Sequence, residues 1–293
     1  MGIGQSGSKF AISDLGFVSG GSKRRDLGLN QLILAEIGPI KGDIRRPVSC
    51  ALIRLLQDPD VAVRLASCRS LCFLIGDCNV SEEDFNEFLP TCWSACFRLM
   101  EELQEFDSKV QILNLISVSM EHAGEKIVPF AKHLTDFFQK MWEESTGESL
   151  LQIQLLAALR NFVGSLGYQS PICYDMVLPI LQKGIDINNP DELNLLEDSV
   201  LLWEATLAHA PSLVPQLLDF FPYLVAIMER SFDHLQVAIS IIEDYIIFAG
   251  AEFLNRHASS LAKLLDGIIG NVSDKGLLST LPIIDVLVQV LKF

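Results

Sequence analysis

Two pairs of cysteines have a spacing that could build a metal site. Cys68 and Cys72, and likewise Cys92 and Cys96, are four residues apart within strongly helical patterns, so the members of each pair share one helix face. Thiolates can hold zinc, often together with histidine, but no histidine lies near either pair in the sequence. The odd total of seven cysteines and this spacing favour small buried hydrophobic side chains in a reducing compartment. We therefore predict no metal site.

The residues that could support catalysis show no catalytic arrangement. The five histidines are scattered along the chain without the His-Glu-x-x-His spacing of zinc enzymes. No serine lies in the Gly-x-Ser-x-Gly turn that exposes a nucleophile. Gly2, Gly4 and Gly7 have the spacing of a dinucleotide-binding loop, but no strand precedes them and no βαβ unit follows. The sequence thus predicts no enzyme, no catalytic residue and no cofactor.

The N-terminal sequence offers one candidate modification site. MGIGQS fits the N-myristoylation pattern, with Gly2 as the acceptor. The basic cluster Lys23, Arg24 and Arg25 could add a weak attraction to a membrane surface. The alternative is a flexible leader, because residues 1–39 are rich in glycine and serine and differ in pattern from the rest of the chain. Gly2 is therefore a candidate lipidation site at the start of this leader.

Acidic side chains are the more informative group. The chain carries 22 Lys and Arg against 37 Asp and Glu, a net charge of −15. Such a field repels nucleic-acid phosphates and attracts basic partners. The alternative for any group of carboxylates is an ordinary solvated face. Five carboxylates are predicted to gather on the second helices of two neighbouring helix pairs, where they form a candidate face for a basic partner: Glu197, Asp198, Glu204, Glu243 and Asp244.

The elements that position these residues are predicted to be helices throughout. From Pro47 onward the apolar residues recur with helical periodicity, and no segment shows the sustained alternation of a strand. Apolar anchors recur every 41 to 47 residues, a period typical of HEAT and armadillo repeats rather than of the roughly 34 residues of TPR units. The sequence therefore predicts an all-α, right-handed HEAT or armadillo-type solenoid over residues 40–293. About six antiparallel helix pairs are expected, at 47–76, 82–121, 127–166, 171–209, 212–249 and 251–291.

The first predicted pair also carries a polar pattern. In QDPDVAVRLASCRSL, Asp58 and Asp60 lie in the turn between the helices, and Arg64 lies near the start of the second helix. This pattern resembles the HEAT consensus, in which a turn aspartate and a helix arginine of neighbouring repeats pair. A carboxylate near a helix N-terminus and a guanidinium of the next unit can form such a ladder. Later pairs lack the pattern and are identified by length and polarity alone.

Several sequence blocks resemble a known family: IKGDIRRPVSCALIRLLQDPDVAVRLASCRSLCFLI, EFDSKVQILNLISV, LNLLEDSVLLWEATL and EFLNRHASSLAKLLDGII. Over about residues 40–293 they look like the middle of an importin-beta, or karyopherin-beta, nuclear transport receptor, in particular of the importin-eleven branch. The most distinctive block is LLED at 195–198 with Leu202 and Trp203. The resemblance implies a HEAT superhelix that carries protein cargo through nuclear pores. It also implies cargo release on binding the GTP form of Ran, and contacts with phenylalanine-glycine nucleoporins between the outer helices.

The resemblance covers only part of such a receptor. Family members are much longer, and their Ran-binding N-terminal region precedes anything that matches here. We expect a partial receptor in the cytoplasm, in the nucleus and at the nuclear pore, with basic protein cargo and nucleoporins as partners, and with Ran as a partner if contacts survive outside that region. No direct nucleic-acid partner is expected, and no membrane span, because the uncharged stretches fall short of ~18 apolar residues. The alternative is a cytosolic HEAT scaffold that joins protein partners without Ran control.

Overall fold

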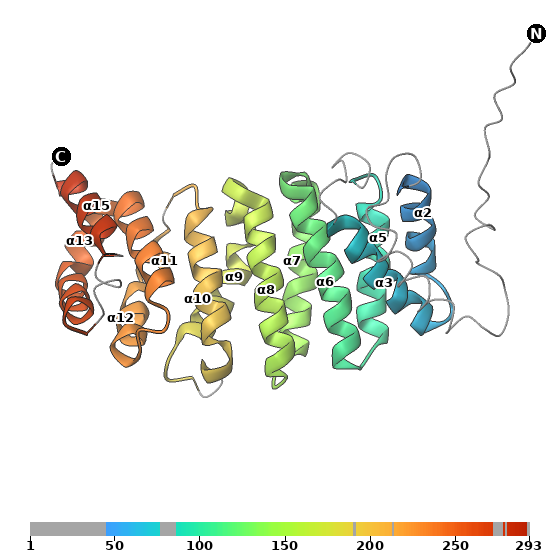
Figure 1. Cartoon of the computed structure of the whole chain (residues 1–293), viewed down its shortest axis with the longest axis horizontal. Coiled ribbons are helices and arrows are strands. Elements are labelled where there is room, and N and C mark those ends of the chain that lie inside the picture. Colours follow the sequence, from blue (N-terminus) through green and yellow to red (C-terminus); the bar gives the residue numbers. More distant parts are fainter. Residues whose placement is uncertain are drawn as a thin grey trace, which may run out of the picture. The chain divides into compact units, whose positions relative to one another are not determined.

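The computed structural model describes residues 45–76, 86–189, 192–212, 214–271, 278 and 280–291. The predicted leader at 1–39, with the candidate lipidation site Gly2, lies outside these residues. The chain divides into two compact units, Met1–Glu102 and Leu103–Phe293. Figure 1 labels the helices of both units.

The first unit contains helices α2 (Arg45–Leu55), α3 (Val61–Gly76) and α5 (Leu89–Glu102). Helices α2 and α3 pack on each other across the turn at 56–60. Their contact is apolar, since Leu52 and Ile53 of α2 and Val63 and Leu71 of α3 are all buried. The burial of these side chains holds the first helix pair together.

Three cysteines lie in the core of the first unit. Cys68 of α3 and Cys92 and Cys96 of α5 are fully buried. Hydrogen bonds with Cys68 and then with Cys92, together with burial, raise the pKa of Cys96 well above its usual value. A thiol that stays protonated packs as a small hydrophobic side chain. Among the described residues, no group of three or more His, Cys, Asp or Glu side chains is arranged to hold a metal ion.

The second unit is a succession of helices that double back on one another. In chain order they are α6 (Phe106–Ala123), η3 (Gly124–Phe130), α7 (Ala131–Glu144), α8 (Ser149–Leu166), η4 (Gly167–Cys173), α9 (Tyr174–Ile185), α10 (Glu192–Ala208), α11 (Pro215–Leu218), α12 (Phe221–Arg230), α13 (Leu235–Asn271) and α15 (Leu281–Leu291).

Two corners of this unit are built in the same way. Helices α6 and α8 both end at a glycine with positive φ, Gly124 at 52° and Gly167 at 54°. Each glycine opens a seven-residue 3-10 helix, η3 or η4, that contains a proline and leads into the next α-helix. Glycine adopts a left-handed φ without the steric cost of a Cβ, so it can end the helix and turn the chain. The repeated corner is direct evidence of a structural repeat.

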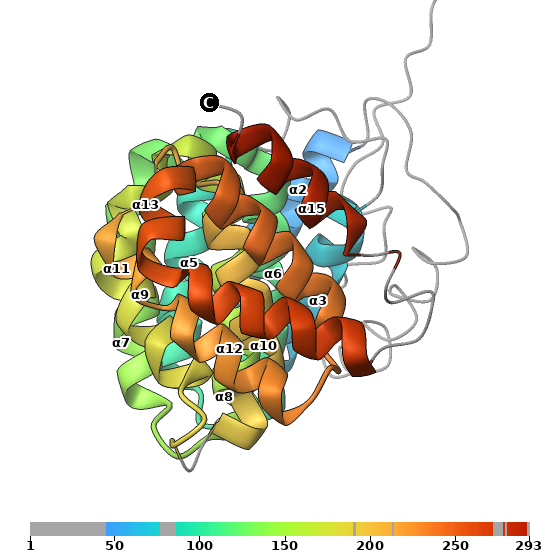
Figure 2. The ribbon, with the colours of Figure 1, turned by 90° about the vertical axis from the view of Figure 1, so that its left-hand side faces the viewer.

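Helices α6, α8, α10 and the first part of α13 form one layer of the second unit. Helix α8 packs on both α6 and α10, and α10 also packs on α13. Figure 1 shows α6, α8 and α10 side by side, and Figure 2 views the molecule from the side of α13 and α15. The stacking gives α8 and α10 two similar neighbours each within the layer, as in a solenoid.

Hydrogen bonds across this layer give the length of the repeat. Asn161 of α8 donates to Ser117 of α6, 44 residues earlier in the chain. Trp203 of α10 donates to Tyr245 of α13, a separation of 42 residues. Equivalent positions on successive helices therefore recur at the period of HEAT units, well above the roughly 34 residues of a TPR unit.

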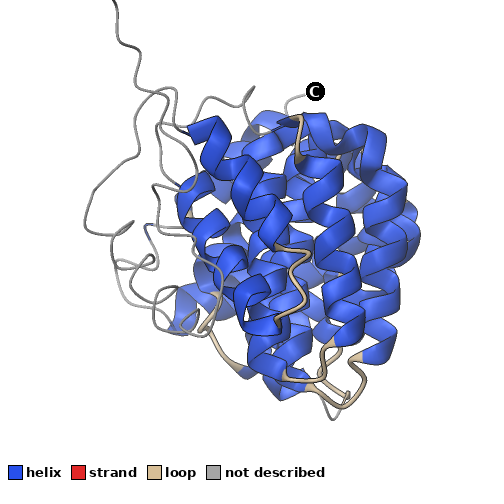
Figure 3. Cartoon of the chain, turned by 90° about the vertical axis from the view of Figure 1, so that its right-hand side faces the viewer, coloured by secondary structure: helices blue, strands red, loops and turns tan. Residues whose placement is uncertain are grey.

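The all-α HEAT-type fold class is confirmed. The described residues form helices joined by turns, without any strand among them (Figure 3). None of the described helices combines the length and the apolar character that crossing a membrane demands.

The predicted break between the last two helix pairs, at 249–251, coincides with a break in the helix geometry. The segments on the two sides of Gly250 together carry the label α13, and the backbone of Gly250 between them is not helical (φ 8°, ψ −86°), so the chain is kinked there. A Cβ at this position would meet Cγ1 of Val290 at 2.7 Å, so α15 approaches the backbone closely there. The absence of a side chain permits both the kink and this approach.

A buried aromatic pair joins α10 to α13. Nε1 of Trp203 donates to the hydroxyl of Tyr245 at 3.1 Å, and that hydroxyl donates to the backbone carbonyl of Leu217 in α11. The two rings are T-shaped, with centroids 6.2 Å apart, and both residues are 0% exposed. The pair satisfies the polar groups of two large core residues and fixes three helices together.

Substitution Tyr245→Phe tests this link. The variant keeps the ring but leaves the Trp203 indole N–H without its acceptor. The Leu217 carbonyl loses the bond from the hydroxyl and keeps the one from the backbone N–H of Phe220. We expect it to lower the free energy of unfolding by about 1–3 kcal/mol, measured by urea denaturation with an unchanged slope. Tyr168→Phe, at a tyrosine that is 73% exposed, is the control and should be neutral. Equal urea midpoints for the two variants would contradict the role of the link.

Candidate protein-binding surfaces

The five predicted carboxylates lie on two neighbouring helices of one layer. Glu197, Asp198 and Glu204 belong to α10, and Glu243 and Asp244 belong to α13. Glu197 is exposed and the other four are partly buried. The structure therefore places all five on two helices that pack together. They form two separate groups, one near Glu204 and the other near Glu197.

The first group consists of Glu204, Glu243 and Asp244, here called the acidic cluster. Burial, and then the nearby charges of Glu204 and Glu243, raise the pKa of Asp244 to about 6. Burial also raises the pKa of Glu243, whose Oε1 is enclosed and makes no hydrogen bond. Asp244 thus lies in a partly dehydrated environment and is repelled by two other carboxylates. A positive charge placed among them would relieve that repulsion.

The aromatic pair sets the position of the acidic cluster. Glu204 follows Trp203 directly, and Asp244 directly precedes Tyr245. The hydrogen bond between Trp203 and Tyr245 fixes α10 against α13, so it also fixes the two carboxylates on opposite sides of the helix contact. The closeness of these carboxylates follows from packing and could not be read from either helix alone.

The second group, Glu197 and Asp198, lies about 10 Å along α10 from Glu204. Burial and the charge of Glu197 raise the pKa of Asp198, whereas the guanidinium of Arg160 in α8 acts in the opposite direction. Arg160 therefore partly neutralises this end of the face. The two groups differ because Asp198 has a positively charged side chain nearby, that of Arg160.

Asp58, Asp60 and Arg64 have local roles in the first unit. A carboxylate oxygen of Asp58 accepts from the backbone N–H of Asp60 at 2.9 Å. The Asp60 carboxylate accepts from the N–H of Ala62 at 2.8 Å, where it satisfies a free donor at the start of α3. These bonds fix the turn between α2 and α3.

The structure differs from the predicted ladder in the partner of Arg64. Nη1 of Arg64 donates to Oε2 of Glu102, at the end of α5, at 2.5 Å. The arginine therefore pairs with a carboxylate of the next predicted helix pair, as the ladder idea requires, but not with a turn aspartate. Asp58 and Asp60 are used locally instead, because backbone donors of the turn lie within their reach.

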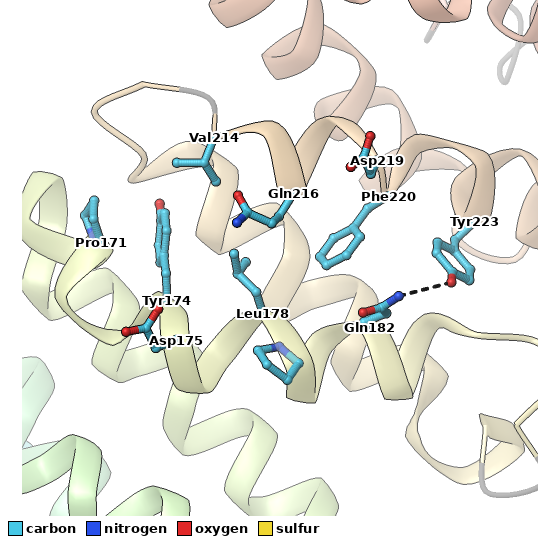
Figure 4. A pocket seen from close by; sticks show the side chains of 11 residues that line it. Pro171, Tyr174, Asp175, Leu178, Gln182, Val214, Gln216, Asp219, Phe220 and Tyr223 are labelled. Carbon is cyan, nitrogen blue, oxygen red and sulfur yellow. Dashed lines mark hydrogen bonds between the residues drawn. The ribbon is translucent and has the colours of Figure 1, made fainter.

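A groove that sequence reasoning missed lies between α9 and the α11–α12 segment (Figure 4). Its volume is about 570 Å³. Its walls are mainly aromatic, proline and aliphatic side chains with a few polar groups, including Pro171, Tyr174, Leu178, Phe220 and Tyr223.

Four polar side chains also line the groove. Nε2 of Gln182 donates to the hydroxyl of Tyr223 at 3.4 Å (Figure 4), and Gln216, Asp175 and Asp219 add an amide and two carboxylates. A concave site that combines aromatic and aliphatic walls with placed polar groups suits a bulky apolar side chain of a partner and the peptide groups next to it. The residues of the two walls are about 40 positions apart in the sequence, so only the repeat period could have predicted that they meet.

The comparisons with known proteins agree with this architecture. A family model described as Importin-11-like, TPR repeats matches residues 153–292. Importin-11 of Mus musculus and importin-11 of Homo sapiens are each 28% identical over 245 residues, which is 84% of this chain and 25% of each relative. The chain therefore spans about a quarter of the length of these curated relatives.

A solved structure shows the same fold. Lph2, a bidirectional nuclear transport receptor of S. cerevisiae, superposes with a TM-score of 0.79 at 20% identity. The match covers 92% of this chain and 28% of Lph2. The chain thus has the all-α solenoid fold of the matching part of this receptor.

By sequence, the chain resembles a segment of the importin-beta family receptors and is similar to importin-11. The family model names TPR repeats, whereas the cross-layer hydrogen bonds recur at HEAT-like separations of 42 and 44 residues. The resemblance that the sequence blocks indicated is therefore confirmed.

The acidic cluster predicts an unusual dependence of stability on pH. Folding raises the pKa of Asp244 from 3.8 to about 6, so ionisation of this group costs the folded state stability. That stability is fully present below about pH 4 and is lost as pH rises to about 6. We therefore expect Asp244→Asn to raise the urea midpoint at pH 7, and its advantage should shrink as pH falls from 6 towards 4.

The control for this prediction is Asp136→Asn, at an exposed aspartate of α7. It should leave the urea midpoint of the protein unchanged at pH 7 and at about pH 4. If Asp244→Asn destabilised the protein at pH 7, Asp244 would be a structural hydrogen-bonding residue rather than a repelled charge.

Proposed function

We propose that this chain is the protein-binding segment of a nuclear import receptor that carries basic protein cargo through nuclear pores under the control of Ran. Similarity to importin-11 supports the transport role. The observation that carries the cargo assignment is the acidic cluster Glu204, Glu243 and Asp244, in which burial and then the charges of Glu204 and Glu243 raise the pKa of Asp244. A basic segment would supply the missing positive charge.

The charge of the whole chain supports the same kind of partner. A net charge of −15 attracts basic proteins and speeds their encounter with the acidic cluster. Asp244, with a pKa of about 6, is mostly ionised at neutral pH and therefore contributes to binding there. The affinity should fall as salt is added, since part of the surface is open to solvent.

The groove between α9 and α12 is proposed as the contact for phenylalanine-glycine nucleoporins. Its aromatic and proline walls can accept a phenylalanine ring, and the absence of a side chain on glycine lets a peptide backbone approach closely. The groove lies on α9 and α12, whereas the acidic cluster lies on α10 and α13. Cargo and nucleoporin would thus use different helices of the same unit.

The proposed location is the cytoplasm, the nucleus and the nuclear pore. Because the chain spans only a quarter of its curated relatives, Ran control is proposed for contacts within these helices. The alternative function is a HEAT scaffold that joins proteins without responding to Ran. Both functions use the acidic cluster, and they differ in whether Ran in its GTP form displaces the bound basic partner.

Charge-neutralising variants test the cargo assignment. A fluorescein-labelled ten-residue peptide of lysine, arginine and serine is titrated with the full chain, and its anisotropy is measured. The double variant Glu204→Gln/Asp244→Asn should bind the peptide about tenfold more weakly, because two partly buried charges at the centre of the surface are lost. The matched control Asp136→Asn/Glu143→Gln changes the net charge equally on α7 and should change the affinity less than about twofold.

Equal weakening by the two variants would show that only the general field of the protein acts, and would reject the acidic cluster as a site. Addition of Ran loaded with a non-hydrolysable GTP analogue separates the two functions. Displacement of the peptide supports the receptor, whereas unchanged anisotropy supports the scaffold.

A second experiment tests the groove. Tyr223 is only partly buried, so Tyr223→Ala should remove one wall without unfolding the protein. We expect it to weaken binding of a synthetic phenylalanine-glycine repeat peptide by at least about fivefold, measured by isothermal titration calorimetry. Tyr168→Ala, at the exposed tyrosine of η4, should have no effect. An unchanged affinity in Tyr223→Ala would exclude this groove as the nucleoporin contact.

A further inference from the structure

Two large apolar side chains lie exposed beside the acidic cluster. Ile247 is 61% exposed and Phe248 is 37% exposed. They are four residues beyond Glu243 and Asp244 respectively on α13, and side chains four apart on a helix lie on the same face. The acidic surface therefore continues, one helical turn further on, into an apolar surface.

Packing of α13 does not account for these two residues. The core face of this helix is formed by Ile241, Ile242, Tyr245 and Ile246, which are all fully buried. That face contacts α10 and α12. Ile247 and Phe248 follow directly but point away from the core. Their exposure leaves apolar area in contact with water, and a bound apolar group would remove that area from water.

The kink at Gly250 helps to leave these residues uncovered. Helix α13 changes direction just after Phe248, and Val290 of α15 lies against the backbone at the kink. Figure 2 shows α13 from this end of the molecule. The last turn before the kink therefore offers an apolar side that is open to a partner.

We propose that Ile247 and Phe248 form an apolar anchor site for the same partner segment that binds the acidic cluster. This inference rests on the proposed function and adds to it the kind of sequence that is recognised. The partner is a basic segment with one bulky apolar residue, because the charges of Glu204, Glu243 and Asp244 select cations and the adjoining turn selects an apolar group.

The geometry also gives the spacing within that segment. One helical turn rises about 5.4 Å, and an extended peptide advances about 3.3 Å per residue. The apolar residue should therefore lie about two positions from the nearest lysine or arginine. A basic segment without such a residue would meet the charges but not the anchor site, so it would bind more weakly.

The test compares two labelled peptides with the full chain. They carry the same lysines and arginines and differ only at one position, two residues from the basic cluster, which is leucine in the first peptide and serine in the second. We expect the leucine peptide to bind about tenfold more tightly, as burial of one leucine side chain implies. The variant Ile247→Ser/Phe248→Ser should remove this preference and leave the affinity for the serine peptide unchanged.

The matched control is Ile269→Ser/Ile284→Ser, since both residues are exposed apolar side chains beyond the kink. It should keep the tenfold preference for leucine. The anchor site is rejected if the wild-type chain binds the two peptides equally, or if Ile247→Ser/Phe248→Ser retains the preference. Near-identical circular dichroism spectra and urea midpoints establish that the variants are folded.

The same measurements separate this inference from the function on which it rests. Glu204→Gln/Asp244→Asn should weaken both peptides by a similar factor, because it removes charge and leaves the anchor site. If that variant has no effect, or if neither peptide binds the wild-type chain, the acidic cluster and the anchor site are both rejected. If only the leucine preference is missing, the acidic cluster remains and the anchor site alone is rejected.

Discussion

The hydrogen bond from Trp203 to Tyr245, continued to the carbonyl of Leu217, is the interaction on which this molecule most depends. It joins side chains 42 residues apart and satisfies the polar groups of two fully buried rings. Apolar packing alone permits neighbouring helices to slide, whereas a directional bond allows only one register. The same bond brings the helix turns that carry Glu204 and Asp244 together. One interaction therefore both stabilises the fold and positions the candidate binding surface.

The acidic cluster represents a local conflict within an otherwise consistent structure. Half-buried carboxylates that repel one another do not stabilise a solenoid, and the raised pKa of Asp244 records that conflict. Asp198, by contrast, has Arg160 nearby. Violations of local rules concentrate at functional sites, and a surface that lacks its own counter-ion is suited to receive one from a partner. Its exposed apolar neighbours, Ile247 and Phe248, add a surface for an apolar side chain of the partner.

A repeat architecture separates binding functions between helices. The groove uses α9 and α12, while the acidic cluster uses α10 and α13. Each helix buries one face against its pair and its neighbours, and the remaining face is free to carry function. The stacking that stabilises the unit thus also gives successive repeats different exposed surfaces. These surfaces are carried mainly by helices rather than by long loops.

The sequence by itself determined the helices, the repeat period and the family, because helical periodicity and turn residues are local properties. It also predicted that Glu204 and Asp244 lie on neighbouring helices, since that follows from the period. Only the tertiary structure decided that their charges interact and that Arg64 pairs with Glu102. The groove and the exposure of Ile247 and Phe248 were likewise decided there. The physical reason is that contacts across a layer depend on the rotation and register of whole helices, which packing sets and local sequence does not encode.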